Sequence, residues 1–299
     1  MAPSRRNADP KTMRDEDAPD GLERDRDDPA ETDARNTKLA FRLLQDRLSR
    51  LPPGESARLR GTFVQELLED SLQVDTRHGP IRFVPMGKRA AGRGHSLLTK
   101  QPATIAWIDG FTPESVFWDI GANVGAYTVY AASRGDIRVV AFEPAANNYF
   151  TLAANCEANG VTHLVDCLLM GVGRERRLAR IDVSQFDLAS SFVFRRPKRE
   201  DRYRHSQTAL MVSIDDAIET FELPCPNYIK IDAPSFSMKI LEGGLTTLAR
   251  PEMRELHIEA DEKPELVALL QPLGFTLAGR HEHGHGTVDV TFVKANQHA

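Results

Sequence analysis

The sequence lacks the features that define several protein classes. Among its 299 residues are only three cysteines, Cys156, Cys167 and Cys225, which form neither a disulfide framework nor a CxxC metal-binding pattern. No apolar run approaches the roughly 20 residues of a membrane-spanning helix. These absences argue against a disulfide-rich secreted domain and against a membrane span, and they predict a reducing, cytoplasmic environment.

A strong charge of one sign and an internal repeat are also absent. The formal net charge is −5, and this mild acidity gives no overall electrostatic attraction to nucleic acid or to an anionic membrane. No segment repeats with a period of about 20–50 residues. We therefore expect no nucleic-acid partner and no repeat architecture. With 41% hydrophobic and 27% charged residues, the composition is that of a globular protein.

Residues 1–38 differ from the rest of the chain. Acidic and basic residues are interspersed there, four prolines interrupt the stretch, and Leu22 is its only large aliphatic residue apart from the methionines. Such a segment cannot bury enough apolar surface to offset the entropy lost on ordering. It has neither the apolar core of a secretory signal nor the acid-poor composition of a mitochondrial transit peptide. The sequence predicts a disordered tail, with a partner-binding tail as the alternative.

Residues 39–110 are predicted to form a small N-terminal cap. Apolar residues recur at helical spacing over 39–48 and 61–72, and short strand-like pieces follow at 81–84 and 103–108. These pieces are too few to build an independent core, so we expect them to pack on the domain that follows.

Residues 111–295 alternate between strand and helix patterns, which predicts right-handed βαβ units and a mostly parallel sheet. The expected strands are 116–120, 138–142, 164–170, 228–231, 256–260, 275–279 and 287–294, and the expected helices are 127–132, 147–158, 237–249 and 264–273. The last two strands have no helix between them, which predicts an antiparallel element at one sheet edge. Their connection holds His281, His283 and His285, which we assign to a hairpin turn rather than to a metal site.

The end of the first parallel strand has the most informative pattern. It continues as Asp119-Ile-Gly121-Ala-Asn123-Val-Gly125 into the first helix. Ligands of open α/β sheets bind at the carboxyl ends of the strands, and glycine and asparagine tolerate the left-handed backbone that such a turn needs. The turn also leaves free N–H groups at a helix N-terminus.

This pattern favours S-adenosylmethionine over other nucleotide cofactors. Both G-x-G-x-x-G and G-x-x-x-x-G-K-[ST] are absent, which makes a nicotinamide-dependent enzyme a weak alternative and excludes a P-loop. The carboxylate of Asp119 would repel a pyrophosphate but attract an ammonium group. Glu143 ends the second strand, where an acid can accept hydrogen bonds from both ribose hydroxyls.

Taken in this order and spacing, the motifs resemble the FkbM family of S-adenosylmethionine-dependent methyltransferases over residues 81–294. Besides the turn and Glu143-Pro144, the resemblance rests on Trp107-Ile108, Ser190-Ser191, Val212-Ser213-Ile214-Asp215, Tyr228-Ile229-Lys230-Ile231-Asp232 and Leu241-Glu242-Gly243-Gly244. It implies a Rossmann-like class I methyltransferase sheet of seven strands, the last one antiparallel. It also implies O-methylation of a hydroxyl on a sugar or other small metabolite.

One segment departs from the family pattern. Family members usually follow the fourth-strand aspartate with an acid, a glycine and a second acid, whereas here Pro234, Ser235 and Ser237 occupy those positions. Pro234 also removes an N–H group and fixes φ. A two-carboxylate or metal-assisted mechanism at this strand end would lose its ligands. The expected consequence is a different acceptor or a catalytically impaired cofactor-binding or scaffold module.

Three residues are candidates for the base that deprotonates an acceptor hydroxyl. Asp232, at the end of the fourth strand, is the first candidate, and Glu259, at the end of the fifth, is the second. His205 is the third and lies beside a basic run, 195–204, which could recognise an anionic acceptor. Lys230 is expected to face the opposite side of the sheet from its strand neighbours. The sequence does not determine the oligomeric state.

Overall fold

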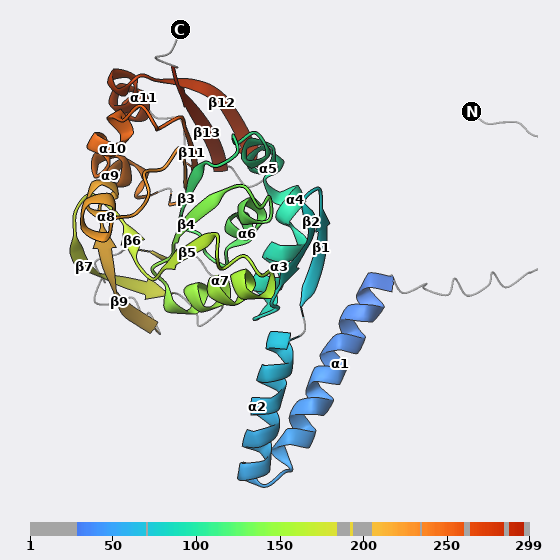
Figure 1. The fold of residues 1–299 in the computed structure, drawn as a ribbon. Coiled ribbons are helices and arrows are strands. Elements are labelled where there is room, and N and C mark those ends of the chain that lie inside the picture. Colours follow the sequence, from blue (N-terminus) through green and yellow to red (C-terminus); the bar gives the residue numbers. More distant parts are fainter. Residues whose placement is uncertain are drawn as a thin grey trace, which may run out of the picture. The chain divides into compact units, whose positions relative to one another are not determined.

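The computed structural model describes residues 29–69, 71–183, 192–193, 205–233, 235–259, 264–283 and 287–295, which divide between Arg60 and Gly61 into two compact units. In the first unit, α1 (Pro29–Ser49) and the start of α2 (Pro53–Glu69) run in opposite directions (Figure 1). The predicted tail boundary at residue 38 lies inside α1. Ala30, Glu31 and Ala34 are good helix formers, so the helix extends beyond its apolar stripe.

The second unit begins with the rest of α2, which two antiparallel strands and three short helices follow. These are β1 (Leu72–Thr76), β2 (Gly79–Phe83), α3 (Lys88–His95), α4 (Leu97–Lys100) and α5 (Pro102–Asp109). The segment 103–108, expected as a strand, is helical in α5. The apolar run is too short for its period to separate a strand from a helix, and Pro102 stands in the first turn, where proline favours a helix start.

A seven-stranded sheet forms the centre of this unit, in the order β12-β13-β11-β10-β3-β4-β5. Its strands are β3 (Val116–Ile120), β4 (Arg138–Phe142), β5 (Val165–Leu168), β10 (Tyr228–Ile231), β11 (Glu255–Glu259), β12 (Phe275–His283) and β13 (Thr287–Lys294). β13 pairs antiparallel with both neighbours, and β3, β4, β5, β10 and β11 pair in parallel. The predicted Rossmann-like sheet of seven strands is confirmed. The antiparallel element expected at one sheet edge is the pair β12–β13, with β12 outermost.

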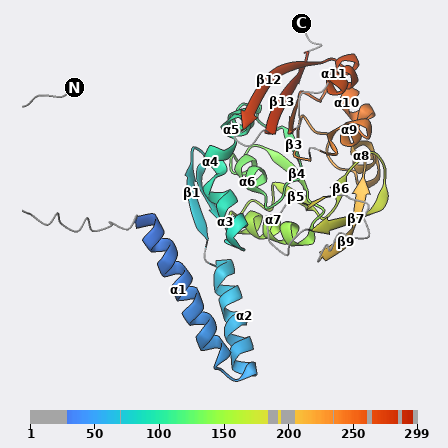
Figure 2. The ribbon, with the colours of Figure 1, turned by 180° about the vertical axis from the view of Figure 1, so that it is seen from behind.

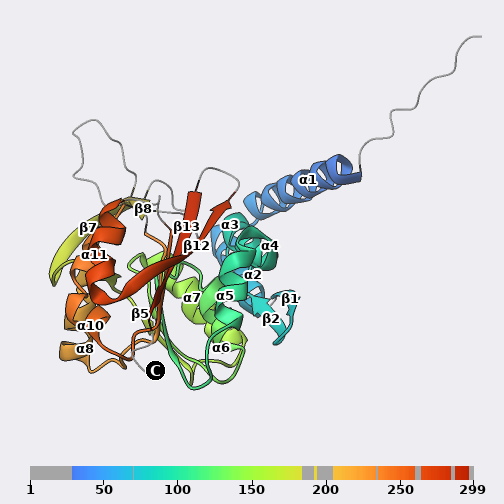
Figure 3. The same cartoon turned by 90° about the horizontal axis from the view of Figure 1, so that it is seen from above.

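Helices cover both faces of the sheet, as Figures 1 and 3 show. Phe117 and Val139 pack with α5, α6 (Ala126–Ala132) and α7 (Ala146–Ala158). Trp118 and Val140, one residue later on each strand, pack in a second core on the other face. The helices of that face are α8 (Ile214–Phe221), α9 (Ser237–Glu242), α10 (Leu245–Ala249) and α11 (Pro264–Leu270), the last followed by a 3₁₀ turn (Gln271–Leu273).

The predicted helix 237–249 is therefore two helices, α9 and α10. The break falls at Gly243-Gly244, where a side chain on Gly243 would collide with the backbone of Gly173. Close packing against the neighbouring loop thus ends α9, although its sequence has helical periodicity.

A second sheet, not predicted from the sequence, is formed by the chain between β5 and α8, and Figure 2 shows its strands β6, β7 and β9. Its strands are β6 (Gly171–Val172), β7 (Arg177–Val183), β8 (Phe192–Val193) and β9 (His205–Val212). Ala179 and Ile181 are buried at alternate positions of β7, so the period-two signal was present but masked by its exposed arginines. Ser190-Ser191 and the basic run 195–204 lie outside the described residues.

Candidate active site

The turn between β3 and α6 has the backbone that its residues predict. Gly121, Asn123 and Gly125 all have positive φ, at 83°, 55° and 79°. The N–H groups of Gly121 and Ala122 both donate to the carbonyl oxygen of Phe142 at 3.0 Å, which fixes the turn to the end of β4. The turn therefore stands at the carboxyl edge of the two central strands, where α/β sheets bind ligands.

Both glycines of the turn are required by close neighbours. A Cβ atom on Gly121 would lie 2.5 Å from the carbonyl oxygen of Asp232, and one on Gly125 would collide with Leu152. The first glycine thus brings the turn against the end of β10, and the second brings it against α7. The turn of residues 119–125, called the cofactor turn below, is therefore in direct backbone contact with Asp232.

Glu143 closes the turn from the β4 side. Its carboxylate is 1% exposed and accepts the N–H groups of Asn123 at 2.9 Å and Ala145 at 2.8 Å. Burial raises the pKa of Glu143 to about 7, against the lowering effect of these hydrogen bonds. Because a carboxylate can accept about four hydrogen bonds, Glu143 keeps capacity for a ligand's hydroxyl groups.

Four polar side chains form a row across the sheet beneath this edge. Asp119, Lys230, His257 and Thr291 lie opposite one another in register on β3, β10, β11 and β13. All four are buried on the face that α5 and α6 cover. Such a row is stable only when its members satisfy one another. The hydrogen bonds and ion pairs of these four side chains are therefore described one residue at a time.

Lys230 is the cation of this row. Its Nζ atom lies 3.4 Å from Asp119 Oδ1 and 3.4 Å from Asp232 Oδ2, and it stands 5.1 Å from the centre of the Tyr127 ring. Burial lowers the pKa of Lys230, but the two carboxylates outweigh burial and raise the net value. The lysine is therefore charged. Ile229 and Ile231 pack in the core on the other face of the sheet, which confirms that Lys230 faces away from its strand neighbours.

Asp119 has its partners inside the protein. The residue is fully buried, Thr128 donates to its Oδ2 atom at 2.7 Å, and Lys230 contacts its Oδ1 atom. The sequence interpretation placed this carboxylate against the cofactor's ammonium group. Within the protein, its contacts with Thr128 and Lys230 also anchor α6 and the lysine.

Asp232 and Glu259 are brought together as a hydrogen-bonded acid pair. Burial raises the pKa of Asp232, but the charge of Lys230 and the hydrogen bond with Glu259 outweigh it and lower the value to about 2. Burial, the charge of Asp232 and the shared hydrogen bond raise the pKa of Glu259 to about 8. The pair thus holds one proton near neutral pH. Although Pro234 and Ser237 replace the family's acids, β11 supplies a second carboxylate at this edge.

His257, a buried member of the same row, was not singled out in the sequence. Its ring stacks on Trp107 with centroids 4.8 Å apart, and its nitrogens lie 3.0 Å from Thr104 Oγ1 and 2.9 Å from Thr291 Oγ1. Burial lowers its pKa, so the imidazole is neutral near pH 7. Its position two residues before Glu259 on β11 was the signal that could have identified it.

The remaining sequence candidates lie apart from this cluster. His205, the third candidate base, is the first residue of β9 in the second sheet. His281 and His283, expected in the hairpin turn, lie instead on β12, because the strand pairing with β13 continues to His283. His285 is outside the described residues. The part of the chain that the structure describes contains no metal-ligand cluster of three His, Cys, Asp or Glu residues. Within that same part, every helix is too short or too polar to cross a membrane.

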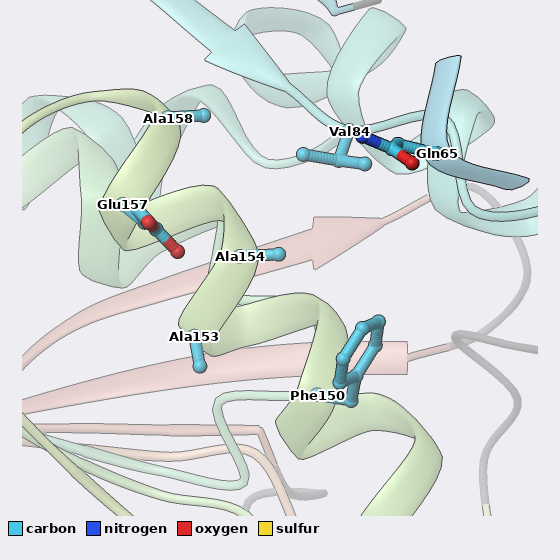
Figure 4. A pocket seen from close by; sticks show the side chains of 7 residues that line it. All are labelled: Gln65, Val84, Phe150, Ala153, Ala154, Glu157 and Ala158. Carbon is cyan, nitrogen blue, oxygen red and sulfur yellow. The ribbon is translucent and has the colours of Figure 1, made fainter. Parts of the chain in front are cut away.

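A separate hollow of about 510 Å³ lies beside α7 (Figure 4). Its lining consists of Gln65, Val84, Phe150, Ala153, Ala154, Glu157 and Ala158. Glu157 is the only ionisable group in this lining, and no member of the acid pair or the cofactor turn takes part. The hollow therefore lacks the acid–base groups that the strand edge provides.

The acid pair predicts an unusual pH dependence of stability. Because the pKa of Glu259 is raised from 4.5 to about 8, the folded state binds a proton that the unfolded state releases. The stabilisation of the folded state by this bound proton is fully present below pH 4.5 and is lost as pH rises towards 8. Wild type should lose about 2–4 kcal/mol of unfolding free energy relative to Glu259→Gln between about pH 5 and pH 8. Urea denaturation of both proteins over this pH range measures the difference. The same pH dependence of the unfolding free energy in both proteins would contradict the prediction.

Comparison with known proteins shows the family of this chain. The sequence model described as "Methyltransferase FkbM domain" matches residues 119–279, more than half of the chain. The hexuronic acid methyltransferase AglP of Haloferax volcanii is 23% identical over 189 residues, which cover 63% of this chain and 74% of that protein.

Solved methyltransferase structures share part of the fold at low identity. Precorrin-6y C5,15-methyltransferase from Geobacter metallireducens is 14% identical, with a TM-score of 0.42 over 67% of this chain and 91% of that one. Sp1610 from Streptococcus pneumoniae, a putative tRNA (m1A22) methyltransferase in complex with S-adenosyl-L-methionine, is 16% identical, with a TM-score of 0.42 over 66% and 72%.

Proposed function

The chain belongs to the FkbM methyltransferase family and uses S-adenosylmethionine, and on that premise we propose that it methylates a hydroxyl group of a sugar or other small metabolite in the cytoplasm. The observation that carries the proposal is the Asp232–Glu259 pair beside the cofactor turn. A hydroxyl acceptor must lose a proton during the transfer, and this pair supplies a group that can take it.

The residues at the turn fit the cofactor. S-adenosylmethionine supplies an electrophilic methyl group on a sulfonium centre when it is bound. Glu143 has the acceptor capacity to bind ribose hydroxyls, and the positive-φ turn of Gly121, Asn123 and Gly125 allows close approach of a ligand to the backbone. Asp119 acts as a positioning residue, since it fixes α6 through Thr128.

Glu259 is better suited than Asp232 to accept the proton. A general base is most effective when its pKa lies near the working pH, and the value of about 8 for Glu259 meets this condition whereas the value of about 2 for Asp232 does not. In this mechanism the acceptor O–H proton passes to the Glu259 carboxylate as the oxygen takes the methyl group. Asp232 stays ionised through Lys230 and orients Glu259.

The alternative of an impaired scaffold module is not favoured. It was based on the loss of the acids at the Pro234 and Ser237 positions. Glu259 restores a two-carboxylate arrangement from the neighbouring strand, so the change is compatible with an altered acceptor rather than lost catalysis.

The function is tested by methyl transfer into small molecules. Purified protein with S-adenosylmethionine carrying a labelled methyl group should add label to a small-molecule fraction of a cell extract, and mass spectrometry should locate the methyl group on oxygen. Cofactor binding without any labelled product would contradict methyltransferase activity. A methyl group on nitrogen or carbon would contradict O-methylation but would leave methyltransferase activity supported.

The role of Glu143 predicts a binding defect. Replacing Glu143 by glutamine removes a charged acceptor of two hydroxyls, so affinity for S-adenosylhomocysteine should fall about 10–100-fold, measured by calorimetry. Glu157→Gln is the matched control, because Glu157 is an exposed acid further along the same β4–α7 unit. Equal affinities of the two variants would show that Glu143 does not bind the cofactor.

A further inference from the structure

Two of the three cysteines meet between α7 and the sheet. Cys156 lies on α7 and Cys167 on β5, and these two elements pack against each other (Figure 1). Their Sγ atoms are 3.7 Å apart, close enough for a hydrogen bond between thiols. Both side chains belong to the core that α6 and α7 cover. Sequence spacing alone did not reveal this pair, because it depends on α7 lying over β5.

The two thiols differ in access and in acidity. Cys156 is 1% exposed, whereas Cys167 is only partly buried and lies on β5, an edge strand of the seven-stranded sheet. The hydrogen bond from the Cys156 thiol lowers the pKa of Cys167, although burial and the charge of Asp166 oppose this effect. The same hydrogen bond and burial raise the pKa of Cys156. Because the thiolate is the reactive form of cysteine, Cys167 is the nucleophile of the pair.

The helix residue next to Cys156 holds the cofactor turn. Asn155 donates from its Nδ2 atom to the carbonyl oxygen of Val124 at 2.7 Å, and both residues are buried. One turn earlier on α7, the side chain of Leu152 fills the space beside Gly125. A displacement of this part of α7 therefore moves the cofactor turn.

We infer that Cys156 and Cys167 form a peroxide-sensitive pair whose oxidation to a disulfide weakens cofactor binding. The Cys167 thiolate sulfur attacks one oxygen of hydrogen peroxide and the O–O bond breaks. The departing hydroxide takes up the proton that the thiol released, which gives water and a sulfenic acid. The Cys156 sulfur then attacks the Cys167 sulfur, and the S–O bond breaks as the hydroxyl group leaves with the Cys156 proton as a second water. Two thiols thus lose two electrons to one peroxide.

Closing the S–S bond draws α7 and β5 together. A disulfide has an S–S distance of about 2.05 Å, so the two sulfur atoms must approach from 3.7 Å. Backbone hydrogen bonds to β4 hold β5 in the sheet, whereas side-chain packing attaches α7, so α7 is the element that shifts. The shift stretches the hydrogen bond from Asn155 to Val124. Affinity for S-adenosylhomocysteine should then fall about tenfold.

The test measures disulfide formation and cofactor affinity in the full chain. Protein treated with hydrogen peroxide and then alkylated is cleaved at glutamates, which cuts after Glu157 between the two cysteines, so mass spectrometry should find the two peptides linked. Calorimetry should show a tenfold loss of S-adenosylhomocysteine affinity that dithiothreitol reverses. Cys167→Ser and Cys156→Ala should each keep their affinity after peroxide treatment. Cys225→Ser is the control and should respond like the wild type, since Cys225 lies outside the pair.

Linked peptides together with a reversible loss of affinity support the inference. If the peptides stay separate after peroxide treatment, or if Cys167→Ser and Cys156→Ala lose affinity as much as the wild type, the inference is wrong. A linked pair with unchanged affinity also overturns it, because the cofactor turn then does not respond to the disulfide. These measurements need no methyl transfer, so a failure of the proposed O-methylation is detected separately.

Discussion

The Glu259→Gln variant is expected to transfer methyl groups roughly 10²–10⁴-fold more slowly than the wild type near pH 8. Wild-type kcat should rise with pH and level off above an apparent pKa of about 8, because only ionised Glu259 can take the acceptor's proton. In the variant this rise should disappear. Burial, Asp232 and Asp289 raise the pKa of Glu259, and Lys230 lowers it.

The measurement is a pH–rate profile with saturating S-adenosylmethionine and the acceptor found in the extract experiment. Glu265→Gln, an exposed acid on α11, provides the control and should keep the wild-type profile. If kcat of Glu259→Gln still rises near pH 8, another group accepts the proton. Cofactor affinity should be unchanged in both variants, which separates a defect in catalysis from a defect in binding.

Replacing Lys230 by methionine should lower the free energy of unfolding by about 3–5 kcal/mol, because Asp119 then remains buried without its cation. The same change should raise the pKa of Asp232, since Lys230 is the nearest charge that favours its ionised form. Urea denaturation measures the loss of stability. Lys239→Met is the control, as Lys239 is exposed and its ammonium group lies over the ring of Phe236.

A double replacement distinguishes charge from packing. Adding Asp119→Asn to Lys230→Met removes the uncompensated charge and should recover part of the lost stability. Lys230→Arg keeps the cation and should cost less than Lys230→Met. A loss below about 1 kcal/mol for Lys230→Met would show that the row does not depend on this ion pair.

The central strands were predictable because their neighbours along the chain define them. β3, β4 and β10 have the predicted limits, since each is an apolar run that ends at a glycine, a proline or an acid. α5 was mistaken for a strand because six residues do not show a period. The four-stranded second sheet depends on pairings between β6, β7, β8 and β9 that local sequence does not reveal.

The candidate site was predictable to the extent that it is local. The positive-φ positions of Gly121, Asn123 and Gly125 follow from residue type alone. Contacts between strands were beyond the sequence argument. The pairing of Lys230 with Asp119 depends on β10 lying next to β3, which requires the order of strands in the sheet.

The row of Asp119, Lys230 and His257 also bears on how the sheet assembles. Side chains alternate between faces, so sliding β10 by one residue would move Lys230 into the apolar core now occupied by Ile229 and Ile231. It would also leave Asp119 and His257 opposite isoleucines. A misaligned sheet would thus contain unpaired buried charges, and this energetic cost favours the observed alignment of β10 with β3 and β11.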